Sequence, residues 1–102
     1  MASYKLLVTM NSHPNHEREL FAHIRELVNK LSPLGLELTD AWYTIYGQAP
    51  EILLGFIARR GFESQLDTIL TSEEWEAVLT EFKEHVTDYK QRIVRATGGF
   101  QF

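Results

Sequence analysis

The chain has 102 residues and no cysteine, so it suits one domain and excludes disulfides, thiol catalysis and thiolate metal sites. Hydrophobic residues make up 44% of it, which favours a packed core over disorder. The net charge is −4 and the Lys and Arg residues are scattered, which argues against nucleic acid as a partner, because phosphate binding needs clustered cations. Residues 1–3 lead directly into a strand-like segment and no apolar stretch approaches a bilayer's thickness, so we expect no signal peptide, no membrane and a cytoplasmic location.

The first third of the chain predicts a strand followed by a helix. Residues 3–10 alternate, with Tyr4, Leu6, Val8 and Met10 on one face. Residues 11–15 have the small polar residues and the proline of a turn and a helix start. A helix that ends near Ser32–Pro33 and Gly35 is then predicted by apolar residues at helical spacing, namely Leu20, Phe21, Ile24, Leu27, Val28 and Leu31.

The middle of the chain predicts a hairpin. Residues 36–46 are rich in aromatic and β-branched residues, residues 47–50 form a turn, and residues 51–60 form a third strand. A short helix is predicted from Phe62, Leu66, Ile69 and Leu70. Residues 71–74 fit a capping box with Thr71 as the cap, which opens a second long helix that carries Trp75, Val78, Leu79, Phe82 and Val86.

The C-terminal part allows two interpretations. Tyr89 and Ile93 could extend the helix, whereas residues 91–96 alternate as a fourth strand. We favour the strand, because a three-stranded sheet would leave the first strand without a neighbour on one side. The predicted fold is therefore α+β, a ferredoxin-like β-α-β-β-α-β domain over residues 1–102 with a four-stranded antiparallel sheet and a tail at 96–102.

The third strand has two apolar faces, one of which carries Leu53 and Ile57. Two helices cover only one face of a sheet, so a second copy of the chain is the expected cover for the other. In this layout and in its aromatic second strand the chain resembles the dimeric α+β barrel superfamily, above all NIPSNAP-like proteins and secondly the antibiotic-biosynthesis-monooxygenase group. The resemblance implies a homodimer with its sheets facing inward, and it restricts function little.

Asp40 is the first candidate for chemistry. It lies in a strand-like run, in register with Leu36, Leu38, Trp42, Thr44 and Tyr46. A carboxylate facing a cavity would have a raised pKa and act as a general base. The alternative, which we favour, is that the second strand is an edge strand, where charges and bulges are common. His13, just past the first strand, is the other candidate base.

Candidate ligand-binding residues follow the same strands. Trp42, Tyr43 and Tyr46 would form an aromatic wall for a flat apolar ligand, although ordinary packing explains them as well. Asn11 would face the same cavity mouth as His13. Arg59, with Arg60, could bind an anion, although a solvated strand end is the simpler explanation.

No cofactor or metal is expected. The four histidines at positions 13, 16, 23 and 85 lack metal-site spacing, and neither a phosphate-binding glycine loop nor a serine-hydrolase elbow is present. Two functions remain. One is a dimeric barrel that holds a small apolar or aromatic molecule; the alternative is a cofactor-independent monooxygenase or isomerase that acts on an aromatic molecule. We favour the first, because only one member of a catalytic constellation is indicated.

Overall fold

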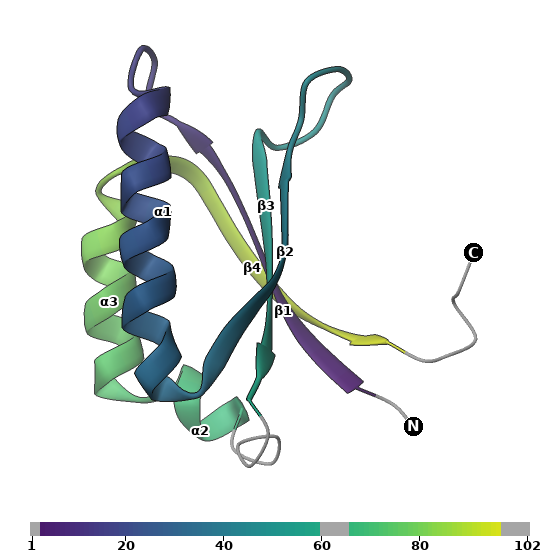
Figure 1. Cartoon of the computed structure of the whole chain (residues 1–102), viewed down its shortest axis with the longest axis vertical. Coiled ribbons are helices and arrows are strands. Elements are labelled where there is room, and N and C mark those ends of the chain that lie inside the picture. Colours follow the sequence, from purple (N-terminus) through teal and green to yellow (C-terminus); the bar gives the residue numbers. More distant parts are fainter. Residues whose placement is uncertain (1–2, 60–65, 97–102) are drawn as a thin grey trace.

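The computed structural model describes residues 3–59 and 66–96. Its elements are β1 (Ser3–Ser12), α1 (Glu17–Leu31), η1 (Ser32–Leu34), β2 (Leu36–Tyr43), β3 (Ile52–Ala58), α2 (Leu66–Leu70), α3 (Glu73–Lys83) and β4 (Val86–Ala96). The strands form one antiparallel sheet in the order β2-β3-β1-β4, and α1 and α3 lie side by side on one face of it (Figure 1). The predicted α+β, ferredoxin-like fold is confirmed.

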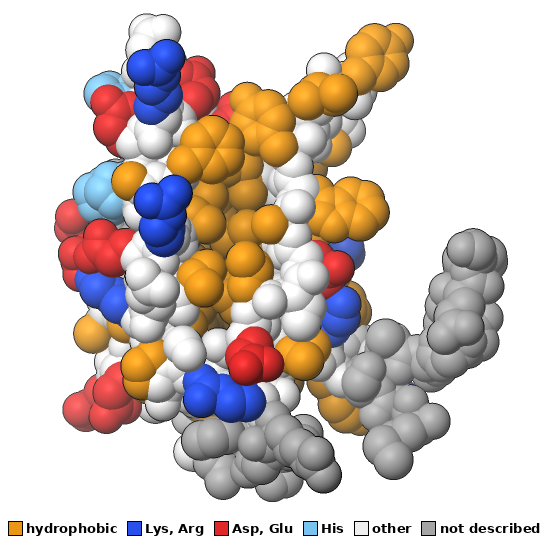
Figure 2. Space-filling view, viewed as in Figure 1, with side chains coloured by type: hydrophobic (Ala, Val, Ile, Leu, Met, Phe, Trp, Pro, Cys, Tyr) orange, Lys and Arg blue, Asp and Glu red, His pale blue; other side chains and the backbone are white. Residues whose placement is uncertain are grey.

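The core lies between the two long helices and the sheet. Figure 2 shows hydrophobic side chains filling this layer and continuing up to the connection between β2 and β3. The predicted alternation is confirmed, since Leu6 and Val8 of β1 and Phe56 of β3 are each only 1% exposed. The helices contribute buried residues at helical spacing, namely Leu20, Leu27, Leu31, Trp75, Leu79 and Phe82.

The starts and ends of the helices depend on local backbone chemistry. Gly35 ends η1 with a φ of 96°, a left-handed conformation that a glycine adopts without steric cost. The N-cap of α3 is Ser72, whose hydroxyl accepts a hydrogen bond from the Trp75 amide at 3.2 Å. The predicted cap, Thr71, is therefore wrong by one residue, because its hydroxyl donates instead to the carbonyl of Asp67 in α2.

The fourth strand is confirmed, and it is longer than predicted. It begins at Val86, which we had assigned to the preceding helix, whereas α3 ends at Lys83. Val86 is 6% exposed, so the same buried apolar side chain suits the end of a helix or the start of a strand. The sequence pattern alone therefore could not place this boundary.

The second strand is shorter than predicted, because β2 ends at Tyr43 and β3 begins at Ile52. The Thr44 amide still bonds to the Glu51 carbonyl at 2.8 Å, so the connection is a hairpin loop of residues 44–51. Phe62, Arg60 and the tail after residue 96 lie outside the described residues. None of the described helices is both long enough and apolar enough to cross a membrane.

Candidate functional site

The face of the sheet that α1 and α3 leave uncovered, hereafter the open face, is set by a bulge in β2. Before the bulge Leu38 pairs with Phe56, and after the extra residue Thr39, Asp40 pairs with Gly55. One extra residue reverses which face the following side chains occupy. Asp40 therefore lies on the open face together with Trp42, whereas Leu36 and Leu38 lie over the core. The expected common face is confirmed for Trp42 and is wrong for the two leucines. The edge-strand interpretation of Asp40 is confirmed, since β2 is the outer strand.

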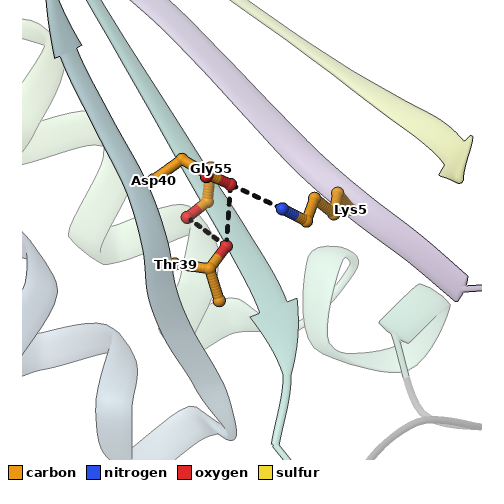
Figure 3. Close-up of polar contacts among 4 residues, drawn as sticks. All are labelled: Lys5, Thr39, Asp40 and Gly55. Atoms are coloured by element: carbon orange, nitrogen blue, oxygen red, sulfur yellow. Dashed lines mark hydrogen bonds and ion pairs between the residues drawn. The ribbon is translucent and has the colours of Figure 1, made fainter. Parts of the chain in front are cut away.

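The Asp40 carboxylate reaches across β3 to β1. Its Oδ2 lies 2.6 Å from the Lys5 Nζ, and the Thr39 hydroxyl donates to the same oxygen at 3.0 Å (Figure 3). The bridge passes over Gly55, where a Cβ atom would stand 2.8 Å from that oxygen. A side chain at position 55 would therefore force the Asp40 carboxylate to move.

The pKa of Asp40 is lowered, because Lys5 and then Thr39 donate hydrogen bonds to the ionised carboxylate. The cavity-facing interpretation of Asp40, which we did not favour, predicts that desolvation raises this pKa. Desolvation acts in that direction but is the weaker effect, since the side chains of Asp40 and Lys5 remain 33% and 30% exposed. A carboxylate held ionised in this way is a weaker base than an ordinary one.

The centre of the open face is apolar. Leu7 of β1 and Leu53 and Ile57 of β3 alternate with the buried side chains of the same strands, so they point away from the helices. Trp42 pairs with Leu53 and is 68% exposed. We call these four residues the apolar stripe. The side of the sheet turned away from the helices therefore has hydrophobic side chains among charged ones, as Figure 2 also shows.

Three of the predicted ligand-binding residues line one groove beside the hairpin loop. Asn11, Tyr43 and Tyr46 enclose a volume of about 490 Å³ with other residues of the loop. Tyr46 is 96% exposed and Ile45 is 89% exposed. The Tyr43 ring lies 5.9 Å from that of Phe21 on α1. The groove therefore combines two tyrosine side chains with a lining that is mostly polar, and Trp42 is not among its lining residues.

Asn11 and His13 do not face the same groove, which corrects our expectation. The Asn11 side chain accepts a bond from the Glu51 amide at 2.7 Å and donates to Asp88 at 3.0 Å, so it holds the hairpin loop and β4 to β1. His13 Nε2 bonds to the Glu84 carbonyl at 3.2 Å and lines a separate groove beside α1. His13 and Asp40 thus lie at different places in the fold.

The second groove gathers all four histidines of the chain. His13 and His16 line it together with His23 and His85, around a volume of about 480 Å³. The rings of His23 and His85 are stacked, with centroids 3.5 Å apart. Within residues 3–59 and 66–96 no three His, Asp or Glu side chains are placed to hold a metal ion. Sequence reasoning missed this stack, because nothing in the local pattern links a residue of α1 to the turn before β4.

The Arg59 side chain makes polar contacts with other residues of its own chain. Its guanidinium donates to the backbone carbonyl and to the hydroxyl of Ser32, and its Nε lies 3.7 Å from the Glu37 carboxylate. These contacts tie the end of β3 to η1 and β2. They favour the structural interpretation of Arg59 over the anion-binding one.

No protein-family model matches the chain, and no curated protein matches it in sequence. Solved structures match its fold. An uncharacterised NIPSNAP domain protein from Burkholderia xenovorans superposes with a TM-score of 0.64 at 10% identity, over 96% of this chain and 97% of that one. A dimeric protein of unknown function with a ferredoxin-like fold from Bacteroides fragilis gives 0.60 at 12% identity, over 91% and 95%. An antibiotic biosynthesis monooxygenase gives 0.54 at 15% identity, over 93% and 97%.

These likenesses confirm the expected resemblance, with NIPSNAP proteins first and the monooxygenase group second, at the level of the fold. At such low identities the ferredoxin-like fold is what the proteins share with this chain, and their assembly and activity are properties of those proteins. The chain therefore has the ferredoxin-like fold of NIPSNAP-family proteins.

Proposed function

We propose that two copies of this chain pair through their open faces and that the pair holds a small apolar or aromatic molecule. The observation that carries the proposal is the apolar stripe, which α1 and α3 leave uncovered. At about 25 cal/mol per Å², covering several hundred Å² of such surface contributes on the order of 10 kcal/mol before the costs of association. A second copy is the simplest cover, since two-fold dimers are the commonest oligomers. The dimeric Bacteroides fragilis protein of the same fold supports it.

The groove beside the hairpin loop is the proposed ligand site. Tyr43 and Tyr46 combine flat apolar rings with hydroxyl groups, which suits a planar molecule that carries a few polar substituents. The groove is open in a single chain, and the loop projects from the end of the sheet (Figure 1).

Native mass spectrometry tests pairing and ligand retention together. We expect a species near twice the chain mass of 11.8 kDa, with a small-molecule adduct on a fraction of it. A species of the single-chain mass at micromolar concentration would contradict the pairing.

The two tryptophans give an independent test, because Trp75 is 4% exposed and Trp42 is 68% exposed in the single chain. If the open face is covered, acrylamide will quench the emission of Trp42 weakly in concentrated protein and strongly on dilution. The variant Trp42→Phe is the control, since Trp75 alone should be weakly quenched throughout.

For the groove, anilinonaphthalene sulfonate should bind the unaltered protein and bind Tyr43→Ala less tightly. Equal binding to both would place the ligand elsewhere.

A cofactor-independent oxygenase or isomerase is the second candidate function. The similarity in fold to an antibiotic biosynthesis monooxygenase favours it. The bond from Lys5 to Asp40 weakens it, because the candidate base is held in its ionised, weakly basic form. An activity on an aromatic substrate that Asp40→Asn abolishes, while the far-ultraviolet circular dichroism is unchanged, would establish the enzymatic role.

A further inference from the structure

Apart from Lys5 of β1, which bonds to Asp40, the charged residues of the open face considered below lie at its two edges. Glu37 and Asp40 lie on β2, at one edge of the sheet, and Lys90 and Arg92 lie on β4, at the other. The backbone register places Asp40, Gly55, Leu7 and Arg92 in one row across the four strands. The next row consists of Trp42, Leu53, Thr9 and Lys90. Each row thus runs from an acidic or aromatic residue at one edge to a cation at the other.

The cations of β4 on the open face have no ion-pair partner within residues 3–59 and 66–96. Among the described residues the carboxylates of the open face are engaged, Asp40 with Lys5 and Glu37 with Arg59, whereas Lys90 and Arg92 form no ion pair. A cation that is buried without a partner costs several kcal/mol. If the open face is covered, the covering surface therefore has to present acceptors opposite β4.

Symmetry limits how a second copy can meet this need. In a two-fold dimer both copies use the same face. Two facing sheets with aligned strands can be related by an axis along the strands or by an axis across them. An axis across the strands places each edge over itself, so that the β4 cations of the two copies face each other. An axis along the strands places the β2 edge of one copy over the β4 edge of the other.

We propose that the two-fold axis of the dimer runs along the strands, between β1 and β3, and that Asp40 of one copy faces Arg92 of the second while Trp42 faces Lys90. This inference rests on the proposed pairing and assigns its geometry. A carboxylate can accept from Lys5 and from a guanidinium at once, because its two oxygens offer about four acceptor sites. A lysine ammonium over an indole ring gains a cation–π contact. Each contact occurs twice in the dimer.

The proposal gives Asp40 a defined role. Its carboxylate is held over Gly55, near the middle of its row, by Lys5 and Thr39. In this position it would accept the guanidinium of the second copy without first losing side-chain entropy, since its own rotamer is already fixed. The bridge in Figure 3 is then a positioning device for the interface.

The absence of cysteine makes the geometry directly testable by cross-linking. Asp40→Cys and Arg92→Cys would be co-expressed and treated with a bis-maleimide that has a two-carbon spacer. Intact mass then separates links between the two variants from links within one. We expect links between the two variants, and few when either is expressed alone. Trp42→Cys with Lys90→Cys is the second pair, which keeps Asp40 and its bridge to Lys5.

Thr80→Cys, on the exposed side of α3, expressed with Arg92→Cys reports random collision. Links that form only between two copies of the same variant would overturn the proposal in favour of the other axis. A dimer in native mass spectrometry that gives no more links in either pair than the Thr80 control would also overturn it. A monomer would instead remove the pairing itself, which separates failure of this inference from failure of the proposed function.

Charge reversal supplies a quantitative measure. Arg92→Glu places two acidic groups opposite each other, twice per dimer, and should weaken association by at least about tenfold. Arg95→Glu is the matched control, because it makes the same change on the same strand, at an exposed position that pairs with Tyr4 on the other face. Equal dissociation constants for the two variants would contradict the contact.

Discussion

The two faces of the sheet are built from the same strands, but only one of them is covered by helices. Phe56 and Ile57 are neighbours in β3, yet Phe56 lies under the helices with 1% of its surface exposed, whereas Ile57 lies half-buried on the open face. The covered face is apolar along its length. The open face carries the apolar stripe, charged residues on β2 and β4, and an ion pair that reaches from Lys5 of β1 to Asp40 of β2 over a glycine. An apolar surface that also carries ordered charges is typical of an interface between proteins.

The two neighbours also differ in what an acidic substitution would disrupt. Acidic substitution of Phe56 or of Ile57 would be equivalent if both lay in the interface. The structure assigns Phe56 to the core and Ile57 to the open face, because successive side chains of a strand point to opposite sides.

The largest expected difference therefore comes from truncating these two neighbours. Phe56→Ala removes a fully buried ring and should lower the free energy of unfolding by about 3–5 kcal/mol. Ile57→Ala should cost less at low protein concentration and progressively more as concentration rises, because its partners come from the second copy. Urea unfolding at several concentrations measures both. If both variants lost the same free energy of unfolding at every protein concentration, the distinction between the two faces would be contradicted.

A second difference concerns Gly55, which is buried on the open-face side beneath the Asp40 carboxylate. Replacing a strand glycine with alanine ordinarily stabilises a protein by about 0.5–1 kcal/mol. Here Gly55→Ala should destabilise it by about 1–3 kcal/mol, because the new methyl group collides with that carboxylate.

The sign of this effect can be tested by a double-mutant cycle measured by urea unfolding. In the Asp40→Ala background the collision is absent, so Gly55→Ala should become neutral or stabilising. The same loss in both backgrounds would show that Asp40 does not occupy the space above Gly55.

The smallest expected effect is on how the free energy of unfolding falls at acidic pH. Asp40 has a folded-state pKa below its ordinary value of 3.8, so it favours folding above that value, and its contribution is lost as the pH falls through the lowered pKa. Asp40→Asn should flatten the decline in stability below about pH 4. Glu26→Gln is the control, because Glu26 pairs with Lys30 on the exposed surface of α1, where solvent screens the pair. A larger change in the control would contradict our account.

The periodicity of apolar residues predicted the first three strands, the long helices and most of the core, whereas it left the fourth strand open between two interpretations. The bulge at Thr39 could not be predicted, because an inserted residue leaves no pattern of its own and reverses the faces of everything after it in β2. The Asp40–Lys5 contact could not be predicted either, because it joins two strands that are separated by β3. Adjacent hydroxyl residues at 71 and 72 both suit a helix cap, and only the contact of Thr71 with Asp67 decides between them.

The sequence predicted some of the residues that line the candidate site, but not where each side chain lies. Tyr43, Tyr46 and Asn11 were selected from the sequence and do line one groove. His13 and Arg59 were selected by the same reasoning and are engaged elsewhere, through a backbone carbonyl and through Ser32. Which polar side chain is already engaged depends on contacts between distant segments, and local patterns do not contain this information.

Sedimentation equilibrium on the unaltered protein beside Ile57→Asp tests the central claim most directly, namely that the open face is the interface between two copies. We predict a mass near twice 11.8 kDa for the unaltered protein at micromolar concentration, and a folded single chain for Ile57→Asp. A single-chain mass for the unaltered protein, or a dimer that Ile57→Asp leaves intact, would contradict the claim.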